Sequence, residues 1–182
     1  MMMRKLIILA GVAASLSLQA STLQRLSLND MIQKSTMIVR GTIQPGTSAA
    51  FRGSIIYTHF RLSVEAPYKG TSGKVIDLAI PGGVLNGIQQ PVAGAPLLTP
   101  GQDYVFFLWT SKSGLTQVIG LSQGLFNITT NTQGQLIVSR GASSEPMLDS
   151  TGQVIVDTTL QMPLAQLLNQ IQTVLAGGAA GQ

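Results

Sequence analysis

The sequence predicts a mainly β protein: an antiparallel β-barrel with a short N-terminal helix and a C-terminal amphipathic helix. Three observations carry this prediction. Apolar and polar residues alternate from Ile56 to Ala66, which is typical of a strand with one buried face. Other short runs, rich in β-branched and aromatic residues, are separated by turns that contain Gly or Pro. Residues 164–175 instead place leucine, isoleucine and valine at helical spacing.

The first 20 residues have the order of a secretory signal peptide. Arg4 and Lys5 precede an apolar run from Leu6 to Ala14, and small and polar residues then lead to Ala20. This run is shorter than the roughly 20 residues that a membrane-spanning helix requires. We therefore expect cleavage after Ala20 and a protein that is secreted or periplasmic. No membrane insertion is expected once the signal peptide is removed.

Composition bounds what the remaining chain can be. It is long enough for one domain, which we place at residues 21–176, with a flexible tail over 177–182. Outside the signal peptide, nine scattered basic residues stand against seven acidic ones, a balance that does not favour nucleic acid as a partner. Cysteine is absent, which excludes disulfides, thiol nucleophiles and zinc–thiolate sites and favours a bacterial source.

The domain is expected to begin with a short helix followed by a strand. Ser27 and Asp30 have the spacing of a capping box, and the apolar residues of 28–35 fall on one helical face. The sequence MIVRGTI, residues 37–43, then changes to β-branched strand composition. Pro45-Gly46 is expected to close this strand.

The only histidine of the chain lies on the polar side of the alternating strand. Tyr57, His59 and Arg61 share this side, because successive side chains of a strand point to opposite faces. We interpret His59 as a solvent-facing strand residue rather than a catalytic one. The strand is expected to end in a turn at Tyr68-Lys69-Gly70, and residues 74–80 supply the next alternating strand.

A long connection rich in Gly and Pro follows over residues 81–101. Loops of this length in a compact domain are usually functional or mobile. The connection also holds too many apolar residues for a solvated linker: Val84, Leu85, Ile88, Val92, Leu97 and Leu98. Part of it should therefore fold back onto the barrel or contact a partner.

The second half of the domain continues with strands. The most apolar is DYVFFLWT, residues 103–110, and further strands are predicted over 115–119 and 125–129. Two turns of similar chemistry then indicate a late pair of hairpins. They are Thr132-Gln133-Gly134-Gln135 and Ser150-Thr151-Gly152-Gln153.

The C-terminal helix is expected to pack its apolar stripe against the sheet. Pro163 is placed in its first turn, where a missing N–H costs nothing, and Gly177 at its end. The opposite face is neutral rather than basic, so binding to a membrane surface is the weaker interpretation.

Three stretches resemble the netrin and tissue-inhibitor-of-metalloproteinase type of domain: STMIVRGTI (35–43), YTHFRLSVEAPYKG (57–70) and LLTPGQDYVFFL (97–108). In those domains, as here, an alternating strand ends in Lys-Gly, and a Gly-x-x-Tyr segment (Gly101 and Tyr104 here) enters an apolar strand. The resemblance covers about residues 27–130 and implies an OB-like barrel. The chain is also similar to a group of uncharacterised exported bacterial domains with this pattern.

One departure from that family bears on function. Metalloproteinase inhibitors of this type place an N-terminal cysteine on the catalytic zinc and staple the barrel with disulfides. The present chain has no cysteine. Neither that inhibitory mechanism nor any site residue is therefore carried over.

Motifs for catalysis or for cofactors are weak. One histidine and seven scattered acids do not form a metal-ligand cluster, and Gly82-Gly83 lacks the Lys-Ser/Thr of a phosphate-binding loop. Asp149-Ser150-Thr151-Gly152 differs from the Asp-Thr-Gly of aspartic proteases by an extra residue, so we interpret it as a turn. A Ser–His–acid triad is not excluded by counting residues, because a serine distant in sequence can lie near His59 in space. We expect no cofactor and no metal.

The sequence thus predicts an exported, non-enzymatic binding module that contacts a protein or an envelope component. Its contact residues are expected to be Tyr57, His59, Arg61, Val84, Leu85 and Ile88. Two alternatives stay open. One is a protease inhibitor that acts by loop insertion without zinc ligation, and the other is a hydrolase that uses His59 as its general base.

Overall fold

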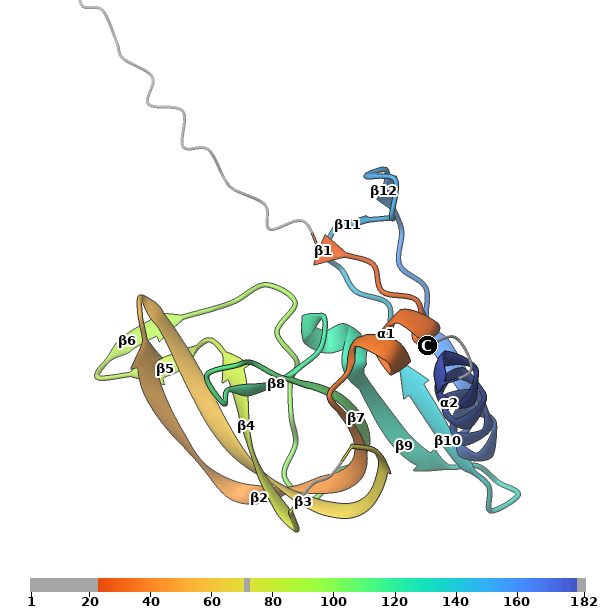
Figure 1. The fold of residues 1–182 in the computed structure, drawn as a ribbon. Coiled ribbons are helices and arrows are strands. Elements are labelled where there is room, and N and C mark those ends of the chain that lie inside the picture. The colour runs from red at the N-terminus through yellow and green to blue at the C-terminus, as the bar shows by residue number, and fades with distance from the viewer. Residues whose placement is uncertain (1–22, 71–72, 180–182) are drawn as a thin grey trace, which may run out of the picture.

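The computed structural model describes residues 23–70 and 73–179 (Figure 1). The predicted signal peptide and the last three residues of the predicted tail lie outside this range. Within it the chain is mainly β with two α-helices, as predicted. Neither helix of the described part is long and apolar enough to cross a membrane.

The elements have the following bounds. The helices are α1 (Leu28–Lys34), a 3-10 turn η1 (Leu121–Gly124) and α2 (Leu164–Ala179). The strands are β1 (Leu23–Gln24), β2 (Met37–Arg52), β3 (Ile55–Lys69), β4 (Val75–Pro81), β5 (Gly83–Leu85), β6 (Ile88–Gln90), β7 (Asp103–Thr110), β8 (Thr116–Val118), β9 (Leu125–Thr130), β10 (Leu136–Arg140), β11 (Met147–Leu148), β12 (Val154–Ile155) and β13 (Leu160–Pro163).

The main sheet is antiparallel and strongly curved (Figure 1). Its order is β13-β10-β9-β7-β2-β3-β4. Strand β8 pairs with the same edge of β7 as β9 does, but further along β7. The curvature brings β4 close to β8, yet no ladder of hydrogen bonds joins these two strands in the described residues. The predicted antiparallel arrangement is therefore confirmed, whereas closure into an OB-like barrel stays a prediction.

Strand β7 divides the interior into two cores, because both of its faces are buried. Val105 and Phe107 point toward the helices, where they meet Met31 of α1 and Leu167 of α2. Tyr104, Phe106 and Leu108 point into the concave side of the sheet. A strand covered on both faces has a continuous apolar sequence, which accounts for DYVFFLWT.

The Lys-Gly end of β3 has a structural role. The Lys69 ammonium donates to the carbonyl oxygens of Ile32 and Gln33, at 2.6 and 2.8 Å, and so satisfies the C-terminal end of α1. Burial lowers the pKa of Lys69. Gly70 has φ +72°, and a methyl group added there would lie 2.5 Å from the Thr36 carbonyl oxygen. The motif thus anchors α1 to the sheet.

The predicted end of the first strand at Pro45-Gly46 is wrong. Strand β2 continues to Arg52, and at Pro45-Gly46 its pairing with β3 shows a register shift, between Ile43 and Thr47. Proline has no N–H to donate to a regular ladder. It is tolerated at such an irregularity because that hydrogen bond is not made there.

The connection over residues 81–101 is also more ordered than predicted. It contains the small hairpin β5–β6, which turns at Asn86 (φ 51°) and Gly87 (φ 78°). Positive φ at both positions is the type I′ geometry that Asn-Gly favours. The expected fold-back is confirmed further along, where Ala95 and Leu98 pack against the concave core.

The late pair of hairpins is confirmed, with shared turn chemistry. Asn131 Oδ1 accepts from the backbone N–H of Gln135, and Asp149 Oδ1 accepts from that of Gln153, at 2.8 and 3.0 Å. The hydroxyl of Thr151 also donates to Asp149, and this hydrogen bond lowers the pKa of the carboxyl.

The boundaries predicted for the C-terminal helix were wrong by a few residues. Pro163 is the last residue of β13, a strand that the sequence analysis missed, and α2 begins at Leu164. The helix also continues through Gly177 to Ala179. A glycine lowers helix stability but ends a helix only where the backbone changes conformation.

Candidate functional site

The predicted polar face of β3 is present and carries a short row of polar side chains. His59 Nδ1 lies 3.1 Å from both carboxylate oxygens of Asp77 on β4. Ser48 on β2 is the direct pairing partner of His59. A shallow pocket at the surface is lined by Ser48, His59, Arg61 and Asp77. Three strands therefore gather a serine, a histidine and an aspartate that the sequence separates.

This row has part of the arrangement that nucleophilic catalysis requires. Asp77 orients the imidazole through Nδ1, which leaves Nε2 as the nitrogen available to a substrate or a serine. No hydrogen bond joins Ser48 to His59 among the described residues, however, and the Asp77 side chain is 71% exposed. Residues 23–70 and 73–179 also contain no cluster of three His, Asp or Glu side chains that could hold a metal ion.

The predicted apolar contacts lie elsewhere, on the β5–β6 hairpin. Val84 and Ile88 are 61% and 54% exposed, whereas Leu85 is partly buried. Strand β5 contacts both β2 and β3, so the hairpin lies beside the tip of the β2–β3 hairpin (Figure 1). That tip exposes two more large apolar side chains, Phe51 at 49% and Ile55 at 39%.

We call Phe51, Ile55, Val84 and Ile88 the end patch. Sequence reasoning found two of its members and missed Phe51 and Ile55. A signal for them exists, since Gly53-Ser54 forms a two-residue turn between paired Arg52 and Ile55. The expected strand end at Pro45-Gly46 hides this signal, because it places residues 47–55 outside any strand.

Side-chain hydrogen bonds hold the β5–β6 hairpin in place. Gln90 Oε1 accepts from the backbone N–H of Ile56 at 2.6 Å, and Gln90 Nε2 donates to the Ser54 carbonyl at 3.1 Å. On the other side, Gly82 N–H donates to the Ile56 carbonyl and the Thr58 hydroxyl donates to the Gly82 carbonyl. The Gln90 amide thus pairs with the edge of β3 much as another strand would.

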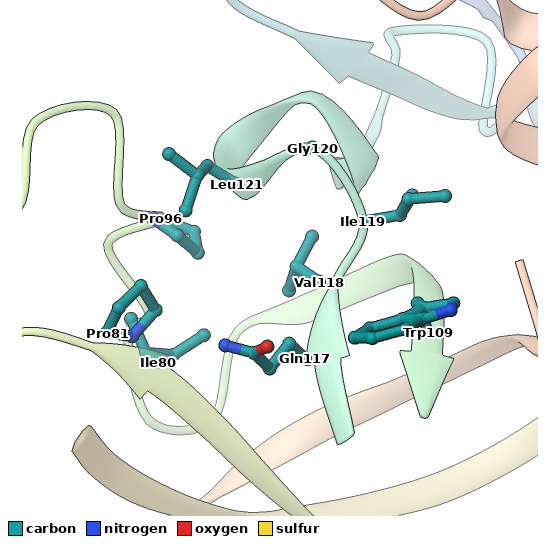
Figure 2. Close-up of a pocket in the computed structure, with 9 residues that line it drawn as sticks. All are labelled: Ile80, Pro81, Pro96, Trp109, Gln117, Val118, Ile119, Gly120 and Leu121. Atoms are coloured by element: carbon teal, nitrogen blue, oxygen red, sulfur yellow. The ribbon is translucent and has the colours of Figure 1, made fainter. Parts of the chain in front are cut away.

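A second pocket lies where β4 and β8 approach without pairing (Figure 2). In the close-up, Pro96 and Leu121 face one another on one side, and Gln117 projects toward Ile80 and Pro81. Its lining is otherwise apolar, with Trp109, Val118, Ile119 and Gly120 completing it. The pocket marks the open seam of the curved sheet.

Two further ion pairs connect elements of the framework. Arg40 on β2 donates to both oxygens of Asp103 on β7, and this hydrogen bonding raises the pKa of Arg40. Arg140 on β10 makes a buried pair with Asp157 at 2.7 Å, which ties the segment before β13 to the sheet. Both pairs are explained by the fold alone.

Comparison with known proteins gave no match to a protein-family model, to a curated protein or to a solved structure.

Proposed function

We propose that the exported protein is a non-enzymatic binding module, built on an OB-like barrel, that contacts a protein of its envelope or surroundings through the end patch. The observation that carries this proposal is the gathering of four exposed apolar side chains from two hairpins at one end of the sheet. The pairing register turns Phe51 and Ile55 to opposite faces of the β2–β3 hairpin, and it does the same for Val84 and Ile88 on the β5–β6 hairpin. The end patch therefore wraps around this end of the sheet, and exposed apolar surface of this kind favours contact with another protein.

The anchoring of the hairpin supports the same conclusion. Interaction surfaces lose less entropy on binding when their side chains are already positioned. Gln90, Gly82 and Thr58 fix the β5–β6 hairpin against β3 before any partner arrives. Full burial of a large apolar side chain contributes about 1.5–3 kcal/mol, so each half-exposed member of the patch offers roughly 1 kcal/mol.

The proposal is tested by affinity capture from the envelope and culture fluid of the source organism, with quantitative mass spectrometry. Wild-type protein is compared with a Phe51→Ser/Ile88→Ser variant and with a matched control, Val154→Ser. Val154 is 73% exposed but lies on β12, in a different sheet. We expect a partner that the control retains and the patch variant loses. A partner retained equally by all three proteins would refute the end patch as the contact surface.

The identity of the recovered partner separates two forms of this proposal. An exported protease whose activity falls on addition of the wild-type protein, but not of the patch variant, would identify the module as an inhibitor that works without zinc ligation. Any other protein partner would identify it as an adaptor or scaffold.

A hydrolase is the second candidate, favoured by the contact between His59 and Asp77 beside Ser48. In this mechanism His59 Nε2 is the general base and Ser48 the nucleophile. It requires activity on a panel of ester and peptide substrates that Ser48→Ala and His59→Ala both abolish. Asp77→Asn should reduce the turnover number while leaving the Michaelis constant nearly unchanged. Full activity of His59→Ala would eliminate this candidate.

A further inference from the structure

The second half of β2 forms a free strand edge. Residues 47–52 pair with β3 on one side, whereas the pairing of β2 with β7 stops at Thr42. The side chains along 47–52 are exposed, except for a partly buried Ala49. In the described part of the chain no strand pairs with the edge that faces away from β3, and at the end of this edge the Arg52 guanidinium donates to the Ser113 hydroxyl in the turn between β7 and β8.

The hydrogen-bond pattern shows which backbone groups this edge presents. Ile56, the pairing partner of Phe51, directs its N–H to Gln90 and its carbonyl to Gly82, both away from β2. In an antiparallel ladder, two directly paired residues either both direct their backbone N–H and C=O groups toward each other or both direct them away from each other. The N–H and carbonyl groups of Phe51 thus point outward, and those of Ala49 and Thr47 follow at two-residue spacing. None of them has a hydrogen-bond partner among the described residues.

The composition of this edge does not oppose pairing. Edge strands are usually protected by charges, prolines or bulges. The segment Thr47-Ser48-Ala49-Ala50-Phe51 contains none of these, because the irregularity at Pro45-Gly46 precedes it and Arg52 follows it. Small, uncharged side chains leave the backbone accessible to an extended chain.

We propose that this edge pairs antiparallel with the same edge of a second copy of the chain, about a twofold axis that passes through Ala49. Thr47 then lies opposite Phe51 of the second copy, and Ala49 lies opposite Ala49. Each of these three residue pairs exchanges two backbone hydrogen bonds, about six in all. The proposal concerns the backbone edge, and so it goes beyond the partner contact proposed for the end patch.

The symmetric register favours a second copy over an unrelated strand. Every outward-facing donor meets an outward-facing acceptor of the same segment, as an isologous interface requires. Arg52 lies opposite Gly46 of the second copy, so the two arginines are at opposite ends of the paired strands and do not repel each other. Phe51, 49% exposed in the single chain, gains a neighbour in Thr47 of the second copy.

Sedimentation velocity of the exported full chain, from micromolar to millimolar concentration, tests this dimer. Ala49→Pro removes an N–H that β3 does not use, and proline is accepted at such an edge position. The loss of two hydrogen bonds per dimer should weaken dimerisation about 5- to 150-fold. The matched control Ala49→Val keeps the N–H and should dimerise like the wild type. Circular dichroism establishes that both variants are folded.

Hydrogen exchange of the wild type gives an independent test that needs no variant. The amides of Thr47, Ala49 and Phe51 should become protected as concentration rises. A protein that stays monomeric throughout, or a dimer that Ala49→Pro leaves unchanged, would overturn the proposal. Protection of these amides only when a captured partner is present would assign the edge to an unrelated strand instead. Ile88→Ser should lose the end-patch partner and still dimerise, so the two proposals fail separately.

Discussion

Replacing Gln90 by leucine is expected to release the β5–β6 hairpin from β3 and leave both cores folded. The variant loses the hydrogen bonds to Ile56 N–H and to the Ser54 carbonyl while keeping a side chain of similar size. Ile56 is fully buried. In the Gln90→Leu variant its N–H therefore has no hydrogen-bond partner, because water reaches it only when the hairpin opens locally. Such an unpaired donor costs about 1–3 kcal/mol.

Amide hydrogen exchange followed by NMR measures this effect. A loss of about 1–3 kcal/mol in the free energy of local opening corresponds to exchange about 5 to 150 times faster at Ile56. Gln89→Leu is the matched control, because Gln89 is the exposed neighbour on the same strand. Wild-type exchange rates at Ile56 and over 83–90 in the Gln90→Leu variant would refute the idea that this side chain holds the hairpin.

Three further predictions concern the framework. Burial acts to raise the pKa of Asp157, but hydrogen bonds from Arg140 and from backbone N–H groups outweigh it, and the pKa falls below 3.8. A carboxyl with a lowered folded-state pKa stabilises the fold above its unfolded pKa and loses this contribution as pH falls. Thermal unfolding followed by circular dichroism should therefore show a steeper loss of stability below about pH 4 in the wild type than in Asp157→Asn. An equal dependence of stability on pH in the two proteins would contradict the lowered pKa of Asp157. Gly41→Ala should destabilise the fold by about 1–3 kcal/mol in urea unfolding, because the added methyl would lie 2.1 Å from the Ser63 carbonyl oxygen. Tyr104→Phe should cost about 1 kcal/mol in the same assay, since its hydroxyl accepts a backbone N–H from the loop before β7 at 3.0 Å; no change in either variant would argue against these contacts.

The elements that the sequence predicted well depend on local rules. The capping box of α1 is formed by Ser27 and Asp30, which are only three residues apart, and the hydroxyl of Ser27 lowers the pKa of Asp30. The alternation predicted for β3 agrees with the burial of Ile56 and Leu62 on one side and the exposure of Arg61 and Glu65 on the other, because a strand turns successive side chains to opposite faces. Asn86-Gly87 could have been recognised in the same way, as a hairpin turn between apolar residues.

The candidate sites depended on contacts that no local rule describes. The alternation placed His59 on a polar face, but only the pairing of three strands brought Ser48 and Asp77 to it. In the same way, the β5–β6 hairpin lies beside the tip of the β2–β3 hairpin because Gln90 binds Ile56, which is 34 residues away in sequence.

By itself, then, the sequence determined the two helices, though not their ends, the course of most strands of the main sheet, and the polar and apolar sides of β3. Tertiary structure alone decided the register between strands, the end patch and the free edge of β2. The physical reason is the range of the interactions. Propensity, capping and alternation act within a few residues, whereas register is set by the simultaneous packing of two cores on opposite faces of β7.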